Sequence, residues 1–350
     1  MFALDDTPTP RYGPLVQGAG VHHNPSPGPA GRPFVYEHVW VVLGLLAAHP
    51  VWGVIALPVL ARLYLHQKDL PNIPESSRPA FAAKVELAVD LMRWATIWLG
   101  FRGKPLWVVA EGADAQAAFL QPMIERGVVV VSRLRKDAAL WTLPELRPVG
   151  RRDRPPIYGK HRIVLAKRAI QPGGWRTNTF AWYGKTTAKR YQTFLATWHP
   201  VGRVMRVVLV DEPEGGRAFF GTDPEASVAE ILGLVADRFS RETCFRNLKQ
   251  IVGAGQQQVR KREANVGSFH LCLGTLTMTE YGAWERSERE WLGPRRESPW
   301  DLQPRRPSHA DQRRAWQREF LAEEMHTVLG NAAKDTEIQE LTQRLLNLAA

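Results

Sequence analysis

The sequence predicts an α/β fold, in which helices flank a sheet and a β-rich insertion precedes a late helix. The first observation is a strand, a helix and a second strand over residues 106–110, 116–126 and 128–132, an order that requires parallel strands. The second is a series of short β-favouring runs, separated by Gly and Pro, in residues 143–221. The third is a helical recurrence of apolar residues in residues 227–251.

The composition indicates a folded protein with a polyanionic partner. Of the 350 residues, 44% are hydrophobic and 23% are charged, as in ordinary folded domains. This length suffices for one large domain or two ordinary ones. Lys and Arg number 46 against 35 Asp and Glu, a net charge of +11. Such a charge favours nucleic acid first and an anionic membrane second, and charge alone does not choose between them.

Nothing in the sequence indicates export, so a cytoplasmic protein is expected. Its 2 cysteines, Cys244 and Cys272, are too few for a disulfide framework or a zinc site. The first residues lack the basic and apolar regions of a signal peptide. The most membrane-like run, residues 39–65, is interrupted by Pro50 and Pro58 and predicts two buried strands, or a strand and a short helix. A membrane-surface protein is a third functional interpretation that depends on this run, and finding it inside a sheet would exclude that interpretation.

The N-terminal part supplies further core elements. Residues 2–4 predict a short strand that ends in Asp5 and Asp6. Residues 18–31 are rich in Gly, Pro, His and Asn and predict a loop. Adjacent side chains of an extended chain point apart, so His22 and His23 are interpreted as ordinary polar residues rather than metal ligands. Residues 81–99 have the apolar face of an amphipathic helix.

The insertion is strongly basic. Strands are predicted at residues 162–166, 179–183, 192–197 and 206–210. Their aromatic residues fit a core, with a nucleic-acid-facing surface as the second interpretation. Gly184-Lys185-Thr186 resembles the end of a phosphate-binding loop, but the required upstream glycine is absent. The most basic tract comprises Arg133, Arg135, Lys136, Arg147, Arg151, Arg152, Arg154, Lys160, Arg162, Lys167 and Arg168.

The late helix carries a stripe of charge. At about 100° per residue, Glu242 lies roughly 40° from Arg238, and Lys249 roughly 20° from Glu242. A carboxylate between two cations suggests a metal ligand beside groups that grip phosphate. A solvated, salt-bridged face explains the same spacing about equally well.

The C-terminal part is expected to leave the core. Residues 269–284 predict a buried helix, residues 285–318 a charged extended arm, and residues 320–350 further helices.

Acidic residues occupy suggestive places in the core. Asp5 ends the first strand, Glu111 ends a central strand, and Glu242 lies on the late helix. Singly, each is more simply a surface acid or a cap, but strand ends are where open α/β sheets place their sites. Three converging carboxylates would hold two divalent ions, a pair that supports phosphodiester displacement. Oxygen ligands of this kind select Mg²⁺ or Mn²⁺.

With these residues in this order, the chain resembles the DDE transposases of bacterial insertion sequences. The resemblance covers about residues 2–284 and implies a ribonuclease H-like core: a mixed sheet flanked by helices, interrupted by a β-rich insertion before the last catalytic helix. Val235 stands where the family's helix motif has tyrosine. The matching motifs are Asp5-Asp6-Thr7 after the first strand, Val108-Val109-Ala110-Glu111-Gly112-Ala113, and Arg-x3-Glu-x6-Lys at Arg238, Glu242 and Lys249.

The resemblance implies a role for each matching residue. Asp5, Glu111 and Glu242 would be the catalytic and metal-binding acids of a two-metal Mg²⁺ or Mn²⁺ site, and Arg238 and Lys249 would contact DNA phosphates. Glu111 stands where the family has aspartate, and its extra methylene, a shift of about 1 Å, would slow a positioned reaction about 10²-fold. Asp114 stands where the family has tyrosine and is a possible substitute for Glu111.

The resemblance therefore implies a transposase catalytic core that cleaves and transfers DNA strands at element ends. Its partners would be double-stranded DNA and a second copy in a possible homodimer, with no membrane. The core would comprise residues 1–142 and 222–284, around the insertion at residues 143–221, with a C-terminal arm and helices at residues 285–350. Family members carry a DNA-binding region before the first strand, which suggests N-terminal truncation. The alternative is an impaired remnant that only binds DNA.

Overall fold

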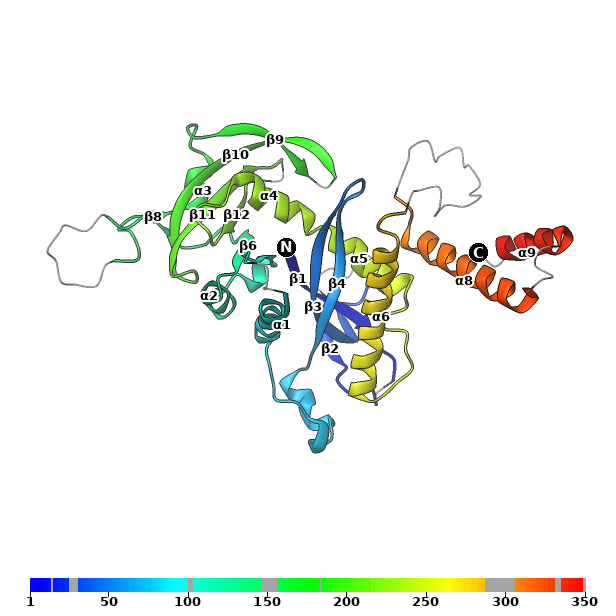
Figure 1. Ribbon diagram of the computed structural model, residues 1–350. Coiled ribbons are helices and arrows are strands. Elements are labelled where there is room, and N and C mark those ends of the chain that lie inside the picture. Colours follow the sequence, from blue (N-terminus) through cyan, green and yellow to red (C-terminus); the bar gives the residue numbers. More distant parts are fainter. Residues whose placement is uncertain are drawn as a thin grey trace.

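Strand β1 (Phe2–Pro10) runs through the middle of the molecule and joins its two halves (Figure 1). The structure is a computed structural model that describes residues 1–13, 15–24, 31–99, 103–145, 156–182, 184–213, 215–286, 306–330 and 335–348. Arg147, Arg151, Arg152 and Arg154 of the basic tract lie outside these ranges.

The core sheet has the strand order β4-β3-β1-β5-β6. Strand β3 (Phe34–His49) is antiparallel to both β1 and β4 (Gly53–Tyr64), whereas β1, β5 (Trp107–Val109) and β6 (Val129–Leu134) are parallel. This mixed sheet with flanking helices confirms the predicted fold class and agrees with a ribonuclease H-like core. The apolar run of residues 39–65 lies within β3 and β4, so the membrane-surface interpretation is wrong.

The alternation of side chains along the strands divides the apolar residues between two faces. Leu4, Val41 and Val108 belong to one buried cluster, while their neighbours, Ala3 and Val109 among them, belong to the other. Successive residues of a strand point to opposite faces, so a sheet covered on both sides needs apolar runs rather than alternation with polar residues. The runs of Val, Leu and Ala in β3 and β6 meet this need.

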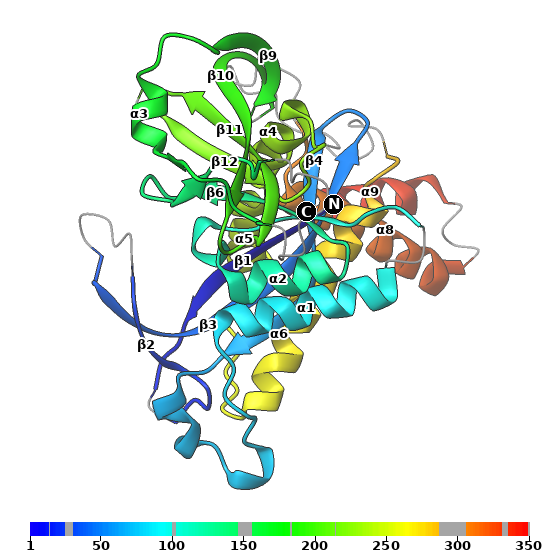
Figure 2. The same cartoon turned by 90° about the vertical axis from the view of Figure 1, so that its left-hand side faces the viewer.

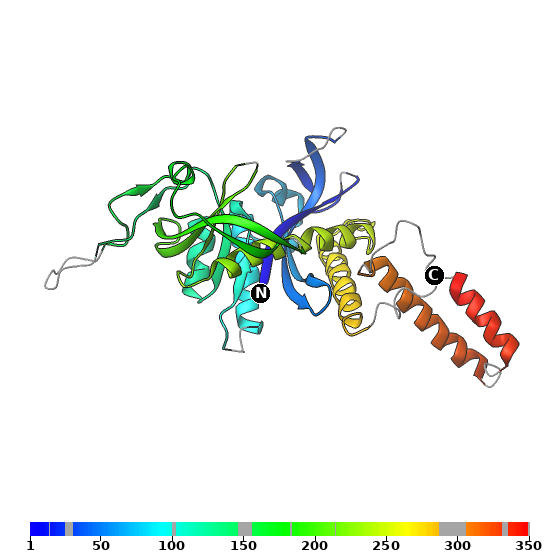
Figure 3. The ribbon, with the colours of Figure 1, turned by 90° about the horizontal axis from the view of Figure 1, so that it is seen from above.

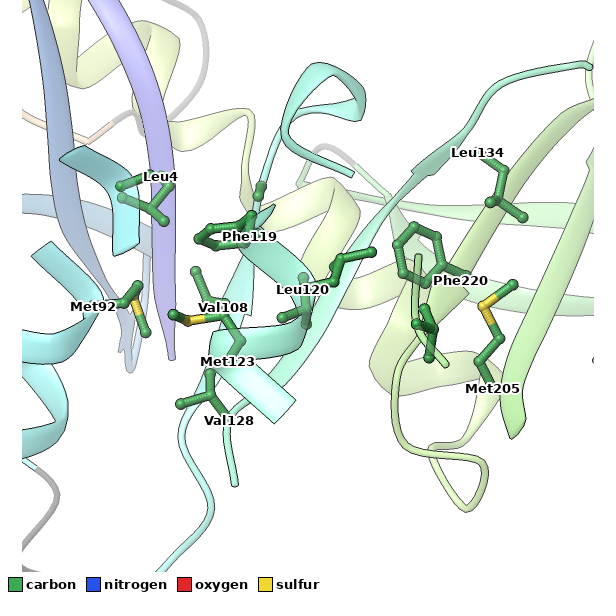
Figure 4. Packing of buried hydrophobic residues seen from close by; sticks show 14 of the residues in the cluster. Leu4, Met92, Val108, Phe119, Leu120, Met123, Val128, Leu134, Met205 and Phe220 are labelled. Atoms are coloured by element: carbon green, nitrogen blue, oxygen red, sulfur yellow. The ribbon is translucent and has the colours of Figure 1, made fainter. Parts of the chain in front are cut away.

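Helices cover each face. The first face carries α1 (Lys84–Leu99) and α2 (Ala117–Glu125), which lie side by side (Figure 2). Met92 of α1 and Phe119 of α2 are fully buried there against the sheet (Figure 4). Burying a side chain of this size contributes about 1.5–3 kcal/mol. The second face carries α4 (Val228–Asp237), α5 (Ser240–Gln250) and α6 (Arg262–Gly282), and Phe269 of α6 stacks on Trp40.

Short elements complete the N-terminal part. Strand β2 (Gly20–His23) pairs with β3 in a segment predicted as a loop. His22 is buried and His23 is exposed, so the two side chains point apart as expected. Between β4 and α1 lie the 3-10 helices η1 (Gln67–Asn72) and η2 (Glu75–Ser77), and η3 (Gly112–Asp114) follows β5.

The insertion extends the core sheet instead of forming a separate layer. Strand β12 (Arg217–Gly221) is antiparallel to β6, and β11 (Arg203–Asp211) and β10 (Lys185–Trp198) follow it. Strands β9 (Arg176–Trp182), β7 (Leu140–Trp141) and β8 (Arg162–Ile163) add to the far side. Sheet and clusters are therefore continuous from core to insertion, and the division at residues 142 and 143 remains a prediction.

Two local predictions in the insertion can be compared with the structure. The strand predicted at residues 162–166 is wrong beyond Ile163, because helix α3 (Leu165–Ala169) begins there and buries Leu165. Gly184, with φ of 74°, lies in the turn between β9 and β10, and Lys185 begins β10. The Gly-Lys-Thr sequence therefore belongs to a hairpin, as the missing upstream glycine indicates.

The late helix is divided. Helix α4 begins at a capping box formed by Ser227 and Glu230. At Arg238 and Phe239 the backbone stays helical but tightens, since Glu242 N donates to Phe239 O at 3.0 Å. Ser240 Oγ also donates to Asp237 O at 2.7 Å. These three-residue turns interrupt the regular α-helical bonding, so the run is divided into α4 and α5 and the single helix expected over it is wrong.

The C-terminal helices project from the body (Figure 3). Helix α8 (His309–Leu329) starts at a capping box of Ser308 and Asp311, so the extended arm predicted for residues 285–318 is wrong from His309 onward. Helix α9 (Thr336–Leu348) packs against α8. At the base of α8, Arg306 and His309 both pair with the buried Glu280 of α6. None of the described helices combines the length and apolar character that a membrane span requires.

Candidate active site

The register of the parallel strands brings two of the predicted acids to the same level. Ala3 of β1 pairs with Val109 of β5, so Asp5 and Glu111 each lie two residues beyond this pair. Two residues is one full period of a strand, so both continue the face that carries Ala3 and Val109. Helices α4 and α5 cover this face.

A cavity of about 910 Å³ opens at this level. Its lining includes Asp5, Glu111 and Glu242, the three predicted acids, together with Arg238. These residues come from the middle of β1, the end of β5 and the helices α4 and α5, and Asp5 and Glu242 are 237 residues apart in the chain. The prediction that the first strand ends at Asp5 is wrong, because β1 continues to Pro10 by pairing with β3. Further basic and acidic residues also line it: Arg133, Arg135, Lys136, Asp137 and Arg217.

The backbone at Glu111 is held in place by the neighbouring strand. Ser132 Oγ of β6 donates to Ala110 O at 3.0 Å and lies 3.1 Å from Glu111 O. The next residue is Gly112, where an added Cβ would lie 3.3 Å from Arg133 O. The chain therefore leaves β5 along a tightly packed path, and the exposed Glu111 side chain is directed by that path to the cavity.

The junction between α4 and α5 positions Arg238 and Glu242. Arg238 lies at the end of α4, and Glu242 lies in the first turn of α5 with its side chain exposed. An acidic residue in the first turn of a helix is favoured by the helix dipole. Both side chains line the cavity, as the helical stripe predicts.

Asp5 is paired with two arginines. Its Oδ2 lies 3.1 Å from Arg238 Nη1 and 2.8 Å from Arg241 Nη2. Its Oδ1 accepts a hydrogen bond of 3.0 Å from the backbone N of Asp6. The Asp5 carboxylate is therefore held between two cations of the α4–α5 junction.

Arg241 is a site residue that sequence reasoning missed. Its side chain is 3% exposed, donates to Leu4 O, and stacks over the Phe245 ring with its Cζ 5.1 Å from the centroid. Burial lowers the pKa of Arg241 to about 9, which leaves it a cation at neutral pH. Helical periodicity marks an arginine as solvent-facing, and only its partner Asp5, remote in sequence, makes the buried position tolerable.

Asp114 and Lys249 do not line this cavity. Burial first, then the neighbouring Glu111 and Asp6 charges, raise the pKa of Asp114 to about 6. Burial lowers the pKa of Lys249, which the nearby Glu37 charge partly offsets. The structure thus brings Asp5, Glu111, Glu242 and Arg238 together, and leaves these two predicted residues outside.

The acids of the cavity supply the oxygen atoms that a divalent cation prefers, but their positions in this structure do not form a coordination site. Carboxylate oxygens suit Mg²⁺ and Mn²⁺. Within the described part of the chain, however, no group of three or more His, Cys, Asp and Glu side chains is arranged to hold a metal ion. The pairing of Asp5 with Arg238 and Arg241 opposes such an arrangement, because it engages the oxygens that would coordinate the cation.

The basic wall of the cavity was only partly foreseen. Arg133, Arg135 and Lys136 belong to the predicted basic tract, but their place beside the acids was not predicted. The parallel pairing of β5 and β6 could have indicated this position. Val109 pairs with Val131, so the carboxyl ends of the two strands meet at one edge of the sheet. Arg217 is contributed by β12, whose pairing with β6 no local sequence pattern reveals.

Comparison with known proteins agrees with this architecture. Residues 1–200 match the model of a family described as DDE superfamily endonuclease. The matched residues include Asp5 and Glu111, and Glu242 follows them. A search of curated proteins finds no match. DDE nucleases generally use divalent metal ions, and an endonuclease domain indicates DNA as the partner. The chain belongs to the DDE superfamily of endonucleases.

Proposed function

We propose that the chain is a DDE-type transposase that cleaves DNA strands at the ends of an insertion sequence and transfers the freed ends to a target. The observation that carries the proposal is the convergence of Asp5, Glu111 and Glu242 on one cavity with a basic wall. A cavity of about 910 Å³ accommodates a phosphodiester and its neighbouring groups. The 2 free cysteines agree with action in the reducing cytoplasm.

The three acids would hold Mg²⁺ or Mn²⁺ as a two-metal site. When bound, such ions activate a water or a 3′-hydroxyl and stabilise the leaving oxygen of a phosphodiester. Arg238, which lines the cavity, contacts a phosphate beside the cleaved bond. Arg241 keeps Asp5 oriented through its ion pair of 2.8 Å.

The remaining basic residues of the cavity bind the DNA backbone. Arg133 and Lys136 are exposed at the rim, and Arg217 adds charge from β12. Binding through phosphates depends strongly on salt and carries little sequence preference. The substrate is double-stranded DNA, both element end and target, and two copies of the chain act on it as a homodimer. Lys249 is a phosphate contact in the resemblance, and this role stays a prediction.

A nicking assay on duplex element-end DNA with Mn²⁺ tests the proposal. Glu242→Ala is expected to lower the nicking rate by at least about 10³-fold, because residues that act as one unit lose most of the rate when one is removed. The matched control is Glu225→Ala, which removes an exposed glutamate that does not line the cavity and is expected to nick like the wild type.

Equal nicking by wild type and Glu242→Ala would remove Glu242 from the mechanism. Absence of nicking in both, with salt-dependent DNA binding retained, would favour the second candidate function. That candidate is an impaired transposase that binds DNA without cleaving it. The observations that favour it are glutamate at position 111 and the engagement of Asp5 by two arginines.

A further inference from the structure

The two arginines that pair with Asp5 are held very differently. Arg241 is 3% exposed and has two further interactions, with Leu4 O and with the Phe245 ring. Arg238 is 32% exposed, lines the cavity, and lies at the junction of α4 and α5. A partly exposed arginine beside an open cavity can turn to a new partner at little cost, whereas the buried one cannot.

The pairing leaves Asp5 little capacity for a cation. An ionised carboxylate has about four acceptor sites on its two oxygens. In this structure Arg238 Nη1 donates to Oδ2, Arg241 Nη2 forms an ion pair with the same oxygen at 2.8 Å, and the backbone N of Asp6 donates to Oδ1. Two guanidinium charges beside one carboxylate also leave a net positive charge, which repels a divalent cation.

A DNA phosphate offers Arg238 a better partner. Arginine binds phosphate with two parallel hydrogen bonds, and the phosphate brings its own negative charge. The cavity that Arg238 lines is also where the basic residues Arg133 and Lys136 gather, so a DNA backbone is drawn to it. A phosphate at this position competes with Asp5 for the same guanidinium.

We propose that Arg238 is a gate on Asp5, which a DNA phosphate opens by taking over the guanidinium, and that Asp5 accepts a divalent cation only after this exchange. The inference rests on the proposed function and adds an order of binding to it, DNA before metal. Arg241 stays in place throughout and orients the freed carboxylate. Without DNA, Asp5 remains paired with Arg238 and Arg241, so the ions are not assembled where they could act on the wrong substrate.

Linkage makes the gate measurable without catalysis. If DNA raises the affinity for the cation, the cation must raise the affinity for DNA by the same factor. The test is a titration of the full chain with Mn²⁺, followed by electron paramagnetic resonance, with and without a short DNA duplex of arbitrary sequence at low salt. A titration of the duplex alone gives the Mn²⁺ bound by DNA itself, which is subtracted.

The wild type is expected to bind Mn²⁺ about tenfold more tightly when DNA is present, a usual size for such coupling. Arg238→Met removes the charge and keeps the aliphatic stem, so its Mn²⁺ affinity without DNA should already be raised about tenfold, with little further gain from DNA. Arg238→Lys keeps a cation beside Asp5 and should restore weak Mn²⁺ binding without DNA. Arg246→Met, an exposed arginine of α5 that does not line the cavity, should behave as the wild type.

The proposal that Arg238 gates Asp5 is contradicted if Arg238→Met leaves the Mn²⁺ affinity without DNA unchanged. It is also contradicted if DNA does not alter the Mn²⁺ affinity of the wild type. In either case, Mn²⁺-dependent nicking that is lost in Glu242→Ala would leave the proposed function standing. Absence of Mn²⁺ binding under every condition would overturn both proposals together. Far-ultraviolet circular dichroism of each variant, with its melting curve, separates these outcomes from a loss of folding.

Discussion

Asp5 and Asp6 are adjacent carboxylates in the middle of strand β1, yet they belong to opposite faces of the sheet. Asp5 faces α4 and α5, pairs with Arg238 and Arg241, and lines the cavity. Asp6 lies on the α1 face and pairs with Lys84. The same residue type at neighbouring positions therefore has two different environments, and the pleat of β1 alone assigns them.

The two environments also differ in their other carboxylates. Glu111 lines the cavity with Asp5, whereas Asp114, three residues later, does not line it. Asp114 is close enough to Asp6 and Glu111 for both charges to raise its pKa. The comparison shows that the face of the sheet on which an acid lies decides whether it can belong to the site. Two adjacent acids in a strand point to opposite faces, so only one of them can line the cavity.

The largest expected effect separates Asp5 from Asp6. Asp5→Asn should lower Mn²⁺-dependent nicking by at least about 10³-fold, because it removes a proposed metal ligand. Asp6→Asn should change the rate no more than a few-fold, since its pair with the partly exposed Lys84 is worth about 0–1 kcal/mol. Rates of both variants are measured on the same duplex as the wild type.

Asp5→Asn also removes the counter-charge of the buried Arg241, so a second variant is needed. Asp5→Glu keeps the charge and displaces the carboxylate by about 1 Å, which should reduce nicking about 10²-fold while the melting temperature stays closer to that of the wild type. A comparable loss in Asp5→Asn and Asp6→Asn would contradict the assignment of function by face.

The next effect concerns Glu111. Glu111→Asp should raise the nicking rate by up to about 10²-fold, because the shorter side chain restores the carboxylate position of the family on a backbone that Ser132 holds in place. The matched control is Asp114→Asn, which should leave the nicking rate unchanged. No gain in Glu111→Asp would show that position 111 does not supply the second acid.

The smallest effect is one of stability. The native state raises the pKa of Asp114 from 3.8 to about 6, so it binds the proton more tightly than the unfolded chain does. This contribution is fully present below about pH 4 and is lost as the pH rises through about 6. Asp114→Asn should therefore be more stable than the wild type above pH 6, by up to about 3 kcal/mol. Urea denaturation on either side of that pH measures the difference, and a constant difference at all pH values would exclude this cause.

Much of the site could be predicted because it depends on strand ends and periodicity. Asp5 follows the apolar run Phe2–Leu4 and Glu111 follows β5, and the strand–helix–strand order makes β5 and β6 parallel. The division of the late helix at Arg238 could not be predicted, since the apolar pattern continues across it. Lys249 was expected on the stripe of Glu242, but it lies two turns, about 10 Å, further along α5 and does not line the cavity.

Burial of charge was the other unpredictable element. Arg241 lies on the inner side of α5 because it forms an ion pair with Asp5 and donates a hydrogen bond to Leu4 O, and both partners belong to a strand at the other end of the chain. Likewise, the basic wall draws Arg217 from a strand whose place beside β6 depends on long-range pairing. Local patterns describe each segment alone, whereas these contacts exist only after the segments have assembled.

The pairing of β12 with β6 also determines how the protein can be shortened. Strand β6 would become a bare sheet edge if the insertion were removed, and its unpaired N–H and C=O groups would be open to pairing with other chains. Phe220 and Met205 would leave the apolar cluster that Phe119 and Leu120 share with them. An excised core is therefore a poor candidate for a minimal nuclease, and the protein is better shortened at the projecting C-terminal helices.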